Sequence, residues 1–433
     1  MNLPHLNSYH TIDAAQTTVD PLGLVSLSGK LSNRLTPGLR ERMSHPRYLT
    51  AMAVGAIVCS AFDEDELATD EVTAPWQVYE WYVASSLVRR FEKEGAEQLS
   101  GMPGRQKTIS AMRKSIHLSK NAYLTNPSVN GFHGVYKTLA KNMTLLDGNG
   151  LGEFGISLID AWEKEQRLDG FQRGGKDSPG RIFRDKLQKA VRDGLTIAAV
   201  DRTWNWDTYT ILADSLAPKN PGKEEANLIF QELKNGSSGK REELISFLMS
   251  AEGQDIIENK SEKDFHSALI KRLVGIAPLL KAIRSYEKFC NLLFNAFYEI
   301  MQWASDHQNK GTLETFSSLP TVKRATAELP WAFAEANELM ETYTEEARIL
   351  YENFNSFSNR NTSTDFVRIL FEHHTRIQRN KVPIPKAPWV IEHVSNSYLV
   401  NSFQDLRKKL DDDYVHVYRT ASLQSFLKDL GKI

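Results

Sequence analysis

The sequence predicts a mainly α-helical protein, and two observations lead to this prediction. Apolar residues recur at intervals of three and four along most of the chain, which is the spacing of one buried helix face, and runs of alternating apolar and polar residues are few. The 433 residues include 41% hydrophobic and 25% charged residues, the composition of an ordinary globular protein. A chain of this length has room for two or three domains.

The first expected domain spans residues 1–170 and begins with a pair of core helices. Pro46 is placed to open the first of them, because proline is well tolerated in the first turn of a helix. The second helix is expected within residues 74–94. Their apolar stripes consist of Leu49, Met52, Ala53, Ala56 and Ile57 in the first helix and of Trp76, Tyr79, Tyr82, Val83, Leu87 and Phe91 in the second.

Residues 104–146 contain no aspartate and no glutamate, although the whole chain has a formal net charge of only −1. An ordinary solvated surface mixes both signs of charge, so this stretch indicates a surface that faces an anion. Because the chain as a whole is nearly neutral, any such function must be local. The basic residues of the stretch are Arg105, Lys107, Arg113, Lys114, Lys120, Lys137 and Lys141.

The order of the expected elements in this region is that of a winged helix-turn-helix. A helix is followed by a turn that contains Pro127 and Gly131, a second helix within 129–146, a glycine-rich connection and a further helix. In that fold, the second helix enters the major groove of DNA and flanking groups hold phosphates. The residues expected to meet DNA near the start of this recognition helix are Asn130, His133, Tyr136 and Lys137, with Lys141 one turn further on.

Val135, Leu139 and Met143 are expected on the inner side of the same helix.

Two other interpretations of the basic surface remain open. It could contact a protein partner, or it could be a solvated face without a special role.

Two glycine-rich connectors suggest the limits of the remaining domains. Residues 171–181, "FQRGGKDSPGR", and 234–244, "KNGSSGKREEL", are rich in turn-forming and charged residues. We therefore expect a small compact domain at 171–244 and a helical C-terminal domain at 245–433. The glycines and lysine of the first connector do not have the spacing of a phosphate-binding P-loop.

The C-terminal domain contains a second basic segment, "EHHTRIQRNKVPIPKAPW", at residues 372–389. His373 and His374 are adjacent and would point about 100° apart on a helix, so they cannot readily share a metal ion. Prolines 383, 385 and 388 predict an extended strap anchored by Trp389. The strap could bind phosphate or a partner, could be purely structural, or could be catalytic; its basic residues are Arg376, Arg379, Lys381 and Lys386.

The sequence gives no sign of a membrane span, a disulfide framework, a metal site or a cofactor. The most apolar run, residues 51–62, is too short to cross a bilayer, and the first residues lack the pattern of a signal peptide. Cys59 and Cys290 are the two cysteines, both in apolar helical settings. We therefore expect a cytoplasmic protein with two core thiols, without a metal or a cofactor.

Five blocks of the sequence resemble an uncharacterised family of bacterial proteins associated with anti-phage defence or DNA-modification operons. The blocks are "HPRYLTAMAVGA", "APWQVYEW", "NGFHGVYKTLAKNM", "LGEFGISLIDAWEKEQ" and "HHTRIQRNKVPIPKAPW". The resemblance implies an accessory or DNA-sensing subunit that works beside an enzyme, and it identifies no catalytic residue.

The sequence thus leads to two hypotheses from different classes. In the first, the protein is a non-catalytic subunit of a defence complex that binds duplex DNA and a second protein. In the second, it is a nuclease whose carboxylates and histidines are distant in sequence. Asp, Glu and His gathered in one basic cleft would favour the nuclease, whereas acids kept away from the basic surfaces would favour the binding subunit.

Overall fold

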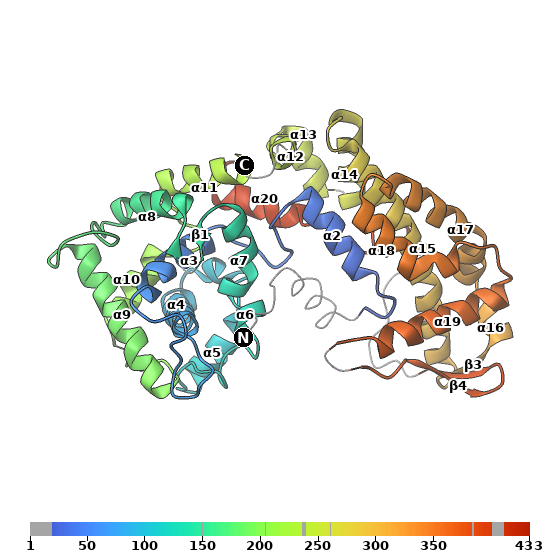
Figure 1. Ribbon diagram of the computed structural model, residues 1–433, viewed down its shortest axis with the longest axis horizontal. Helices are drawn as coiled ribbons and strands as arrows, with labels where there is room; N and C mark the ends of the chain where they lie inside the picture. Colours follow the sequence, from blue (N-terminus) through green and yellow to red (C-terminus); the bar gives the residue numbers. More distant parts are fainter. Residues whose placement is uncertain are drawn as a thin grey trace. The chain divides into compact units, whose positions relative to one another are not determined.

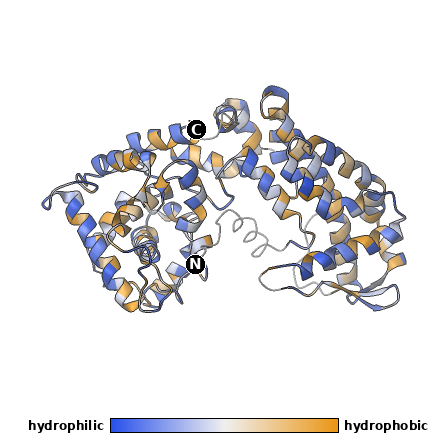
Figure 2. Cartoon of the chain, in the orientation of Figure 1, coloured by the Kyte–Doolittle hydropathy of each residue, from blue (hydrophilic) through white to orange (hydrophobic). Residues whose placement is uncertain are grey.

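The computed structural model describes residues 20–148, 150–203, 205–235, 240–259, 261–382, 385–400 and 411–433. The protein is mainly α-helical, as the periodicity predicts (Figure 1). Most helices carry hydrophobic and hydrophilic residues side by side, which is expected of helices with one buried face (Figure 2). In the described residues, no helix combines the length and the apolar character needed to cross a membrane.

The chain divides into two compact units, and both are discontinuous in sequence. Unit 1 comprises residues 1–35 and 252–418, and unit 2 comprises residues 36–251 and 419–433. The expected separate domain at 171–244 is part of unit 2, because α11 (Lys223–Asn235) packs on α8 (Glu153–Glu165) and α10 (Thr208–Ser215) packs on α4 (Pro75–Phe91). Residues 236–239 of the second connector lie outside the described residues.

Unit 2 is built around two central helices, α3 (Tyr48–Cys59) and α4. The side chains of α3 are buried on all sides except at Ala56 and Cys59, because α4, α7 (Phe132–Asn142), α8 and α9 (Pro179–Ile197) all pack against it. The predicted stripe on α3 is therefore only part of its buried surface. The other elements of unit 2 are η1 (Ala96–Leu99), α5 (Arg105–Arg113), α6 (Pro127–Asn130), α7 (Phe132–Asn142), β1 (Leu146–Asp147), β2 (Gly150–Leu151), α9 (Pro179–Ile197), α12 (Lys240–Leu248) and α20 (Thr420–Asp429).

The two central helices approach each other closely at Gly55. A Cβ atom at this position would lie 2.6 Å from the ring of Tyr79 on α4. The Tyr79 hydroxyl donates a hydrogen bond of 2.9 Å to the carbonyl oxygen of Ala51. Larger residues at position 55 would force the helices apart, so the glycine allows this contact.

Unit 1 is a helical unit with one small sheet. Its longest helix, α15 (Ala277–Asp306), packs along α17 (Pro320–Met340). Strand β5 (Ser397–Val400) lies between β3 (Lys310–Thr312) and β4 (Val390–Val394), and both pairings are antiparallel. The remaining elements are α2 (Val25–Leu35), α13 (Ala251–Asn259), which begins at the boundary, α14 (Glu262–Arg272), α16 (Leu313–Ser318), α18 (Thr344–Phe354), η2 (Asn355–Phe357) and α19 (Ser363–Arg379).

Three buried histidines in unit 1 make its stability depend on pH. Burial lowers the pKa of His266 to about 3 and those of His373 and His374 to about 4. An unfolded histidine has a pKa of about 6.5, so between about pH 4 and 6.5 the unfolded state binds more protons than the folded state. The stability these groups provide is complete above pH 6.5 and is lost as the pH falls.

We expect the backbone amides of α19 to lose hydrogen-exchange protection between pH 7 and pH 5, after correction for intrinsic exchange rates. Each histidine can contribute a slope of up to about 1.4 kcal/mol per pH unit. In the His374→Gln variant, which lacks one of the titrating groups, this slope should be smaller. Equal slopes for the two proteins would contradict the assignment to His374.

Candidate nucleic-acid interface

The basic side chains of the first half of the acid-free stretch lie on the solvent side of α5 and its C-terminal end. Thr108, Ile109 and Ala111 occupy the buried side of this helix, which leaves the cations at the surface. Lys107, Arg113, Lys114 and Lys120 are exposed, and Arg105 is half-buried.

Arg113 forms an ion pair with a carboxylate of α4's C-terminal end. The Nη2 atom of Arg113 lies 2.9 Å from an Oε1 oxygen of Glu92, and the Arg113 side chain is 73% exposed. An exposed ion pair of this kind contributes little to stability and can exchange its partner. Lys120, in the connection after α5, interacts electrostatically with Asp70. Within the described part of the chain, Lys107 and Lys114 form no ion pair.

Helix α7 is held in place by a buried carboxyl group of α4. The Glu80 carboxyl group accepts hydrogen bonds from the backbone N–H of His133 at 3.1 Å and from the Tyr123 hydroxyl at 3.0 Å. A carboxyl group at the first turn of a helix satisfies N–H groups that have no partner inside the helix. Burial raises the pKa of Glu80 to about 7, and these hydrogen bonds oppose the rise.

Tyr136 is buried, whereas the sequence analysis expected it at the surface. Its side chain is fully buried, and its hydroxyl oxygen accepts hydrogen bonds of 3.0 Å from the backbone N–H groups of Ser44 and His45. Its ring stacks on Phe426 of α20, with 6.2 Å between the ring centroids. Tyr136 therefore ties α7 to two other segments of unit 2.

The ring of His133 also packs within unit 2. Its ring stacks on Trp76, with 4.5 Å between the centroids. Burial, followed by the positive charges of Lys137 and Lys141, lowers the pKa of His133 to about 3. The imidazole is therefore neutral near pH 7 and supplies no positive charge for a phosphate.

Lys137 and Lys141 lie four residues apart on α7, and within the described residues neither ammonium group forms an ion pair. Lys141 is exposed and Lys137 is half-buried. Burial, with a further effect of Lys141, lowers the pKa of Lys137. Two neighbouring cations without an acid repel each other, and an anionic ligand would relieve this repulsion.

The structure adds two arginines to this surface that the sequence interpretation missed. Residues 36–43 pass along α7, since a Cβ atom at Gly38 would lie 3.1 Å from the Cα atom of Leu139. Arg42, in the same segment, donates a hydrogen bond from its guanidinium group to the side-chain oxygen of Asn130. Asn130 thus positions Arg42 at the N-terminal side of α7.

Arg40 belongs to the same group of cations. Burial and the neighbouring charge of Arg42 lower the pKa of Arg40 to about 10. Arg419, which precedes α20, donates to the backbone carbonyl of Leu39, and burial together with Arg40 lowers its pKa to about 10. With a pKa of about 10, Arg40 and Arg419 still carry a positive charge at pH 7. The short basic sequence "LRER" at residues 39–42 was the available signal.

The second basic patch lies in unit 1, at the C-terminal end of α19. Arg376 is exposed and donates a hydrogen bond of 2.7 Å to the carbonyl oxygen of Asn353. Arg379 and Lys386 are exposed, whereas Lys381 is half-buried and interacts with Asp20. Basic side chains at a helix C-terminus stabilise the helix dipole, so part of this patch has a structural explanation.

The histidines and the tryptophan of the strap are structural. The ring nitrogens of His373 and His374 lie 2.8 Å and 2.9 Å from the carbonyl oxygens of Leu22 and Pro21. The second nitrogen of His374 accepts a hydrogen bond of 2.9 Å from the backbone N–H of Trp389, whose side chain is half-buried. Helix α19 ends at Arg379, and residues 385–389 have no regular secondary structure. Pro383 lies outside the described residues.

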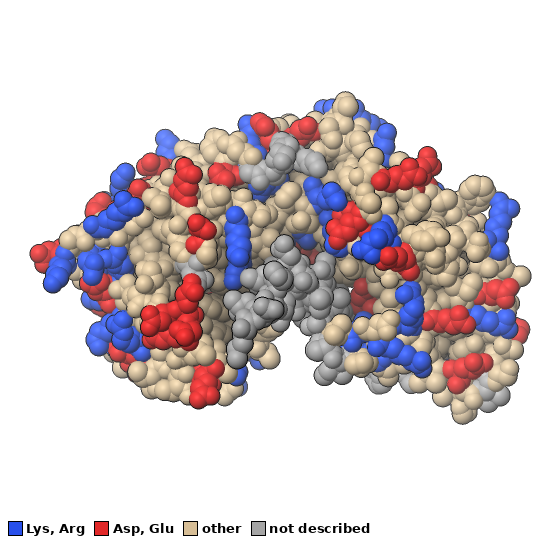
Figure 3. All heavy atoms as spheres, in the orientation of Figure 1, with Lys and Arg blue, Asp and Glu red and all other residues tan. Residues whose placement is uncertain are grey.

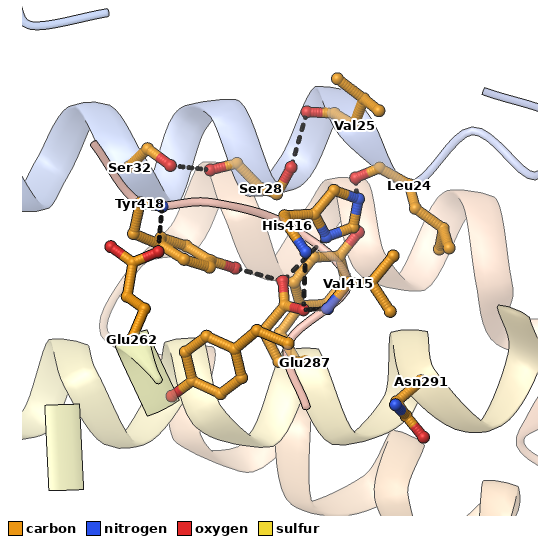
Figure 4. A network of polar contacts seen from close by, with 12 residues as sticks. Leu24, Val25, Ser28, Ser32, Glu262, Glu287, Asn291, Val415, His416 and Tyr418 are labelled. Atoms are coloured by element: carbon orange, nitrogen blue, oxygen red, sulfur yellow. Dashed lines mark hydrogen bonds and ion pairs between the residues drawn. The ribbon is translucent and has the colours of Figure 1, made fainter. Parts of the chain in front are cut away.

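In the described part of the chain, one group of three metal-ligating side chains comes together: Glu287, Cys290 and His416 of unit 1. Figure 4 shows that the Glu287 carboxylate is the centre of a network of hydrogen bonds. It accepts from the backbone N–H groups of Val415 and His416, from His416 Nδ1 and from the Tyr418 hydroxyl. With both oxygens engaged, the carboxylate has a structural role, and the group lies in a different unit from the α5 and α7 cations.

On the face shown in Figure 3, Lys and Arg side chains are interspersed with Asp and Glu over both units. Comparison of the chain with protein-family models, with curated proteins and with solved structures found no match. The function of the protein is therefore inferred from the residues described above.

Proposed function

We propose that the protein is a non-catalytic DNA-binding subunit of a bacterial defence complex and that unit 2 contacts duplex DNA. The observation that carries the proposal is the set of cations on α5, α7 and the segment before α3 that lack carboxylate partners among the described residues. The set consists of Arg40, Arg42, Lys107, Lys114, Lys137 and Lys141.

These side chains suit contact with the phosphate backbone better than recognition of bases. Lysine and arginine neutralise phosphates and release counterions, which provides affinity without sequence preference. Tyr136 and His133, which were expected near the bases, are engaged within the unit. We therefore propose a protein that senses duplex DNA mainly through its backbone.

The order of elements supports a winged-helix arrangement of this surface. Helix α5 precedes α6 and α7, and a short hairpin of β1 and β2 connects α7 to α8. In such an arrangement α7 would be the recognition helix, and Lys137 and Lys141 would be its phosphate contacts. The role in defence rests on the resemblance of the five sequence blocks, and the second basic patch of unit 1 is a candidate contact for the partner protein.

We expect the double variant Lys137→Glu with Lys141→Glu to bind duplex DNA much more weakly than the unaltered protein. Loss of two phosphate contacts should lower the slope of log K against log salt concentration by about 2. Electrophoretic mobility shifts, measured at several salt concentrations with duplex DNA, single-stranded DNA and RNA, test this expectation.

Lys186→Glu with Lys189→Glu is a matched control in the same unit. Both lysines lie on α9 and already pair with carboxylates, at 3.0 Å with Asp207 and at 3.3 Å with Asp193. The control causes the same change in net charge and should retain most of the affinity. Equal losses in the two double variants would show general electrostatic attraction instead of a defined surface, and unchanged binding by the α7 variant would refute the proposal.

A further inference from the structure

A polar cavity in unit 1 lies outside the surface proposed for DNA. Its volume is about 740 Å³, and its walls come from α14, α15, α17 and residues 412–414. Ligand pockets for small molecules commonly have about 300–1,000 Å³. The cavity is therefore large enough for an organic molecule and larger than a single inorganic ion needs.

Helix α15 presents a row of cations to the cavity. Lys281, Arg284 and Lys288 follow one another at intervals of three and four residues, so they share one face of the helix. Lys288 lies 3.3 Å from a carboxylate oxygen of Glu335. In the described residues, Lys281 and Arg284 have no carboxylate partner; Arg284 contacts the hydroxyl of Ser267 at 3.2 Å.

Two hydroxyl groups next to these cations have no hydrogen-bond partner among the described residues. The side chain of Ser285 is only 4% exposed, and its Oγ atom is buried without a partner. The hydroxyl of Tyr414, which interacts electrostatically with Arg284, is also buried without a hydrogen-bond partner. A buried polar group without a partner is costly, and a ligand that accepts its hydrogen bond removes this cost.

The wall that carries Tyr414 is firmly attached to α15. The side-chain amide of Asn291 donates to the carbonyl oxygens of Asp411 and Asp413, at 2.7 Å and 2.9 Å. Lys263 of α14 donates to the carbonyl oxygen of Asp412 at 2.6 Å. The shape of this side of the cavity is therefore set before a ligand arrives.

The rest of the lining is mixed. Ile270, Leu292 and Leu339 supply apolar surface, and Glu287, Glu335, Asp412 and Asp413 supply carboxylates. Two further cations, Lys263 and Arg324, already contact Asp412. A ligand that fits must combine an anionic group with an uncharged body that donates hydrogen bonds. Guanidinium, ammonium and hydroxyl groups together are typical of phosphate recognition.

We propose that this cavity binds a ribonucleoside 5′-monophosphate. Its phosphate lies against Lys281, Arg284 and the hydroxyl of Ser285, its base lies along the apolar wall, and its ribose hydroxyls donate to the carboxylates. The cavity is contained in unit 1, so this ligand is independent of the DNA contact proposed for unit 2.

Isothermal titration calorimetry of the full chain with AMP, GMP, CMP and UMP tests the proposal. We expect at least one nucleotide to bind, and Lys281→Ala with Arg284→Ala to weaken it by about tenfold or more, as expected when charge-assisted hydrogen bonds are lost. The control, Lys271→Ala with Lys323→Ala, removes two exposed lysines on α14 and α17 that do not line the cavity, and it should bind as the unaltered protein does.

Ser285→Ala separates ligand binding from folding. Because the hydroxyl has no partner among the described residues, its removal should leave the melting temperature unchanged or raise it, and nucleotide affinity should fall. Lys137→Glu with Lys141→Glu should bind the nucleotide normally. The proposal is overturned if none of the four nucleotides binds, if inorganic phosphate or the nucleoside alone binds equally well, or if the control variant loses as much affinity.

Discussion

Glu225→Gln should lower the free energy of unfolding of unit 2 by about 3–5 kcal/mol, the range found when one member of a buried ion pair is removed. Glu225 on α11 and Arg47 at the start of α3 are both fully buried. Their side chains form two parallel contacts, Nε to Oε1 and Nη2 to Oε2, each of 3.0 Å. The variant would leave the Arg47 guanidinium buried without a compensating charge.

The surrounding hydrogen bonds increase the effect. The third guanidinium nitrogen of Arg47 donates to the carbonyl oxygen of Ala217 at 2.8 Å, and the Thr50 hydroxyl donates to Glu225 at 2.6 Å. The Nε and Nη2 atoms of Arg47 and the Thr50 hydroxyl thus all donate to the Glu225 carboxylate. The amide of glutamine replaces one acceptor oxygen by an NH₂ group that faces the arginine.

Urea unfolding followed by circular dichroism measures the loss, and an exposed ion pair of the same unit provides the control. Arg90 and Asp214 lie 2.8 Å apart and are 43% and 48% exposed. Asp214→Asn should cost less than about 1 kcal/mol. If Glu225→Gln were no more harmful than Asp214→Asn, the buried pair would not be the link between α3 and α11 that we infer.

This pair also shows why the boundaries of the domains were not predictable. Arg47 and Glu225 are separated by 178 residues, and neither has a local pattern that identifies its partner. Glycine-rich connectors mark loops, but only long-range contacts decide whether a loop separates two domains. The small sheet of unit 1 also depends on long-range contacts, because β3 pairs with β5, about ninety residues later in the chain.

The candidate site was predictable in part. Charge is a local property, so the absence of acids from residues 104–146 identified exposed cations such as Lys107, Lys114 and Lys141. The orientation of α7 was less evident. The sequence analysis assumed a narrow buried stripe with one residue in four. The observed stripe is wider and consists of Phe132, Gly134, Val135, Tyr136, Leu139 and Ala140.

Tyr136 directly follows Val135 within this wide stripe and precedes Leu139 by three positions, so the apolar spacing alone was compatible with burial. The arginines of residues 40 and 42 were missed for a different reason. Their segment lies against α7 through tertiary contacts, such as that of Gly38 with Leu139, which no local pattern encodes.

The second large effect is expected for Glu287→Ala in unit 1, with a loss of about 3 kcal/mol or more. Glu287 is 1% exposed, and its carboxylate accepts four hydrogen bonds from residues 415–418 (Figure 4). The two shortest are 2.6 Å from the Tyr418 hydroxyl and 2.7 Å from the Val415 N–H. Alanine would leave all four donors without their acceptor, and each buried donor left unsatisfied costs about 1–3 kcal/mol.

Hydrogen exchange at the amides of Val415 and His416, together with thermal unfolding, measures this loss. Both N–H groups donate to the same Glu287 oxygen, so both should exchange much faster in the variant. Glu328→Ala is the matched control, because Glu328 is 47% exposed and pairs with Arg324 on the surface of α17. Protected amides at 415 and 416 in Glu287→Ala would show that residues 415–418 are held to α15 by packing, and that the carboxylate is dispensable.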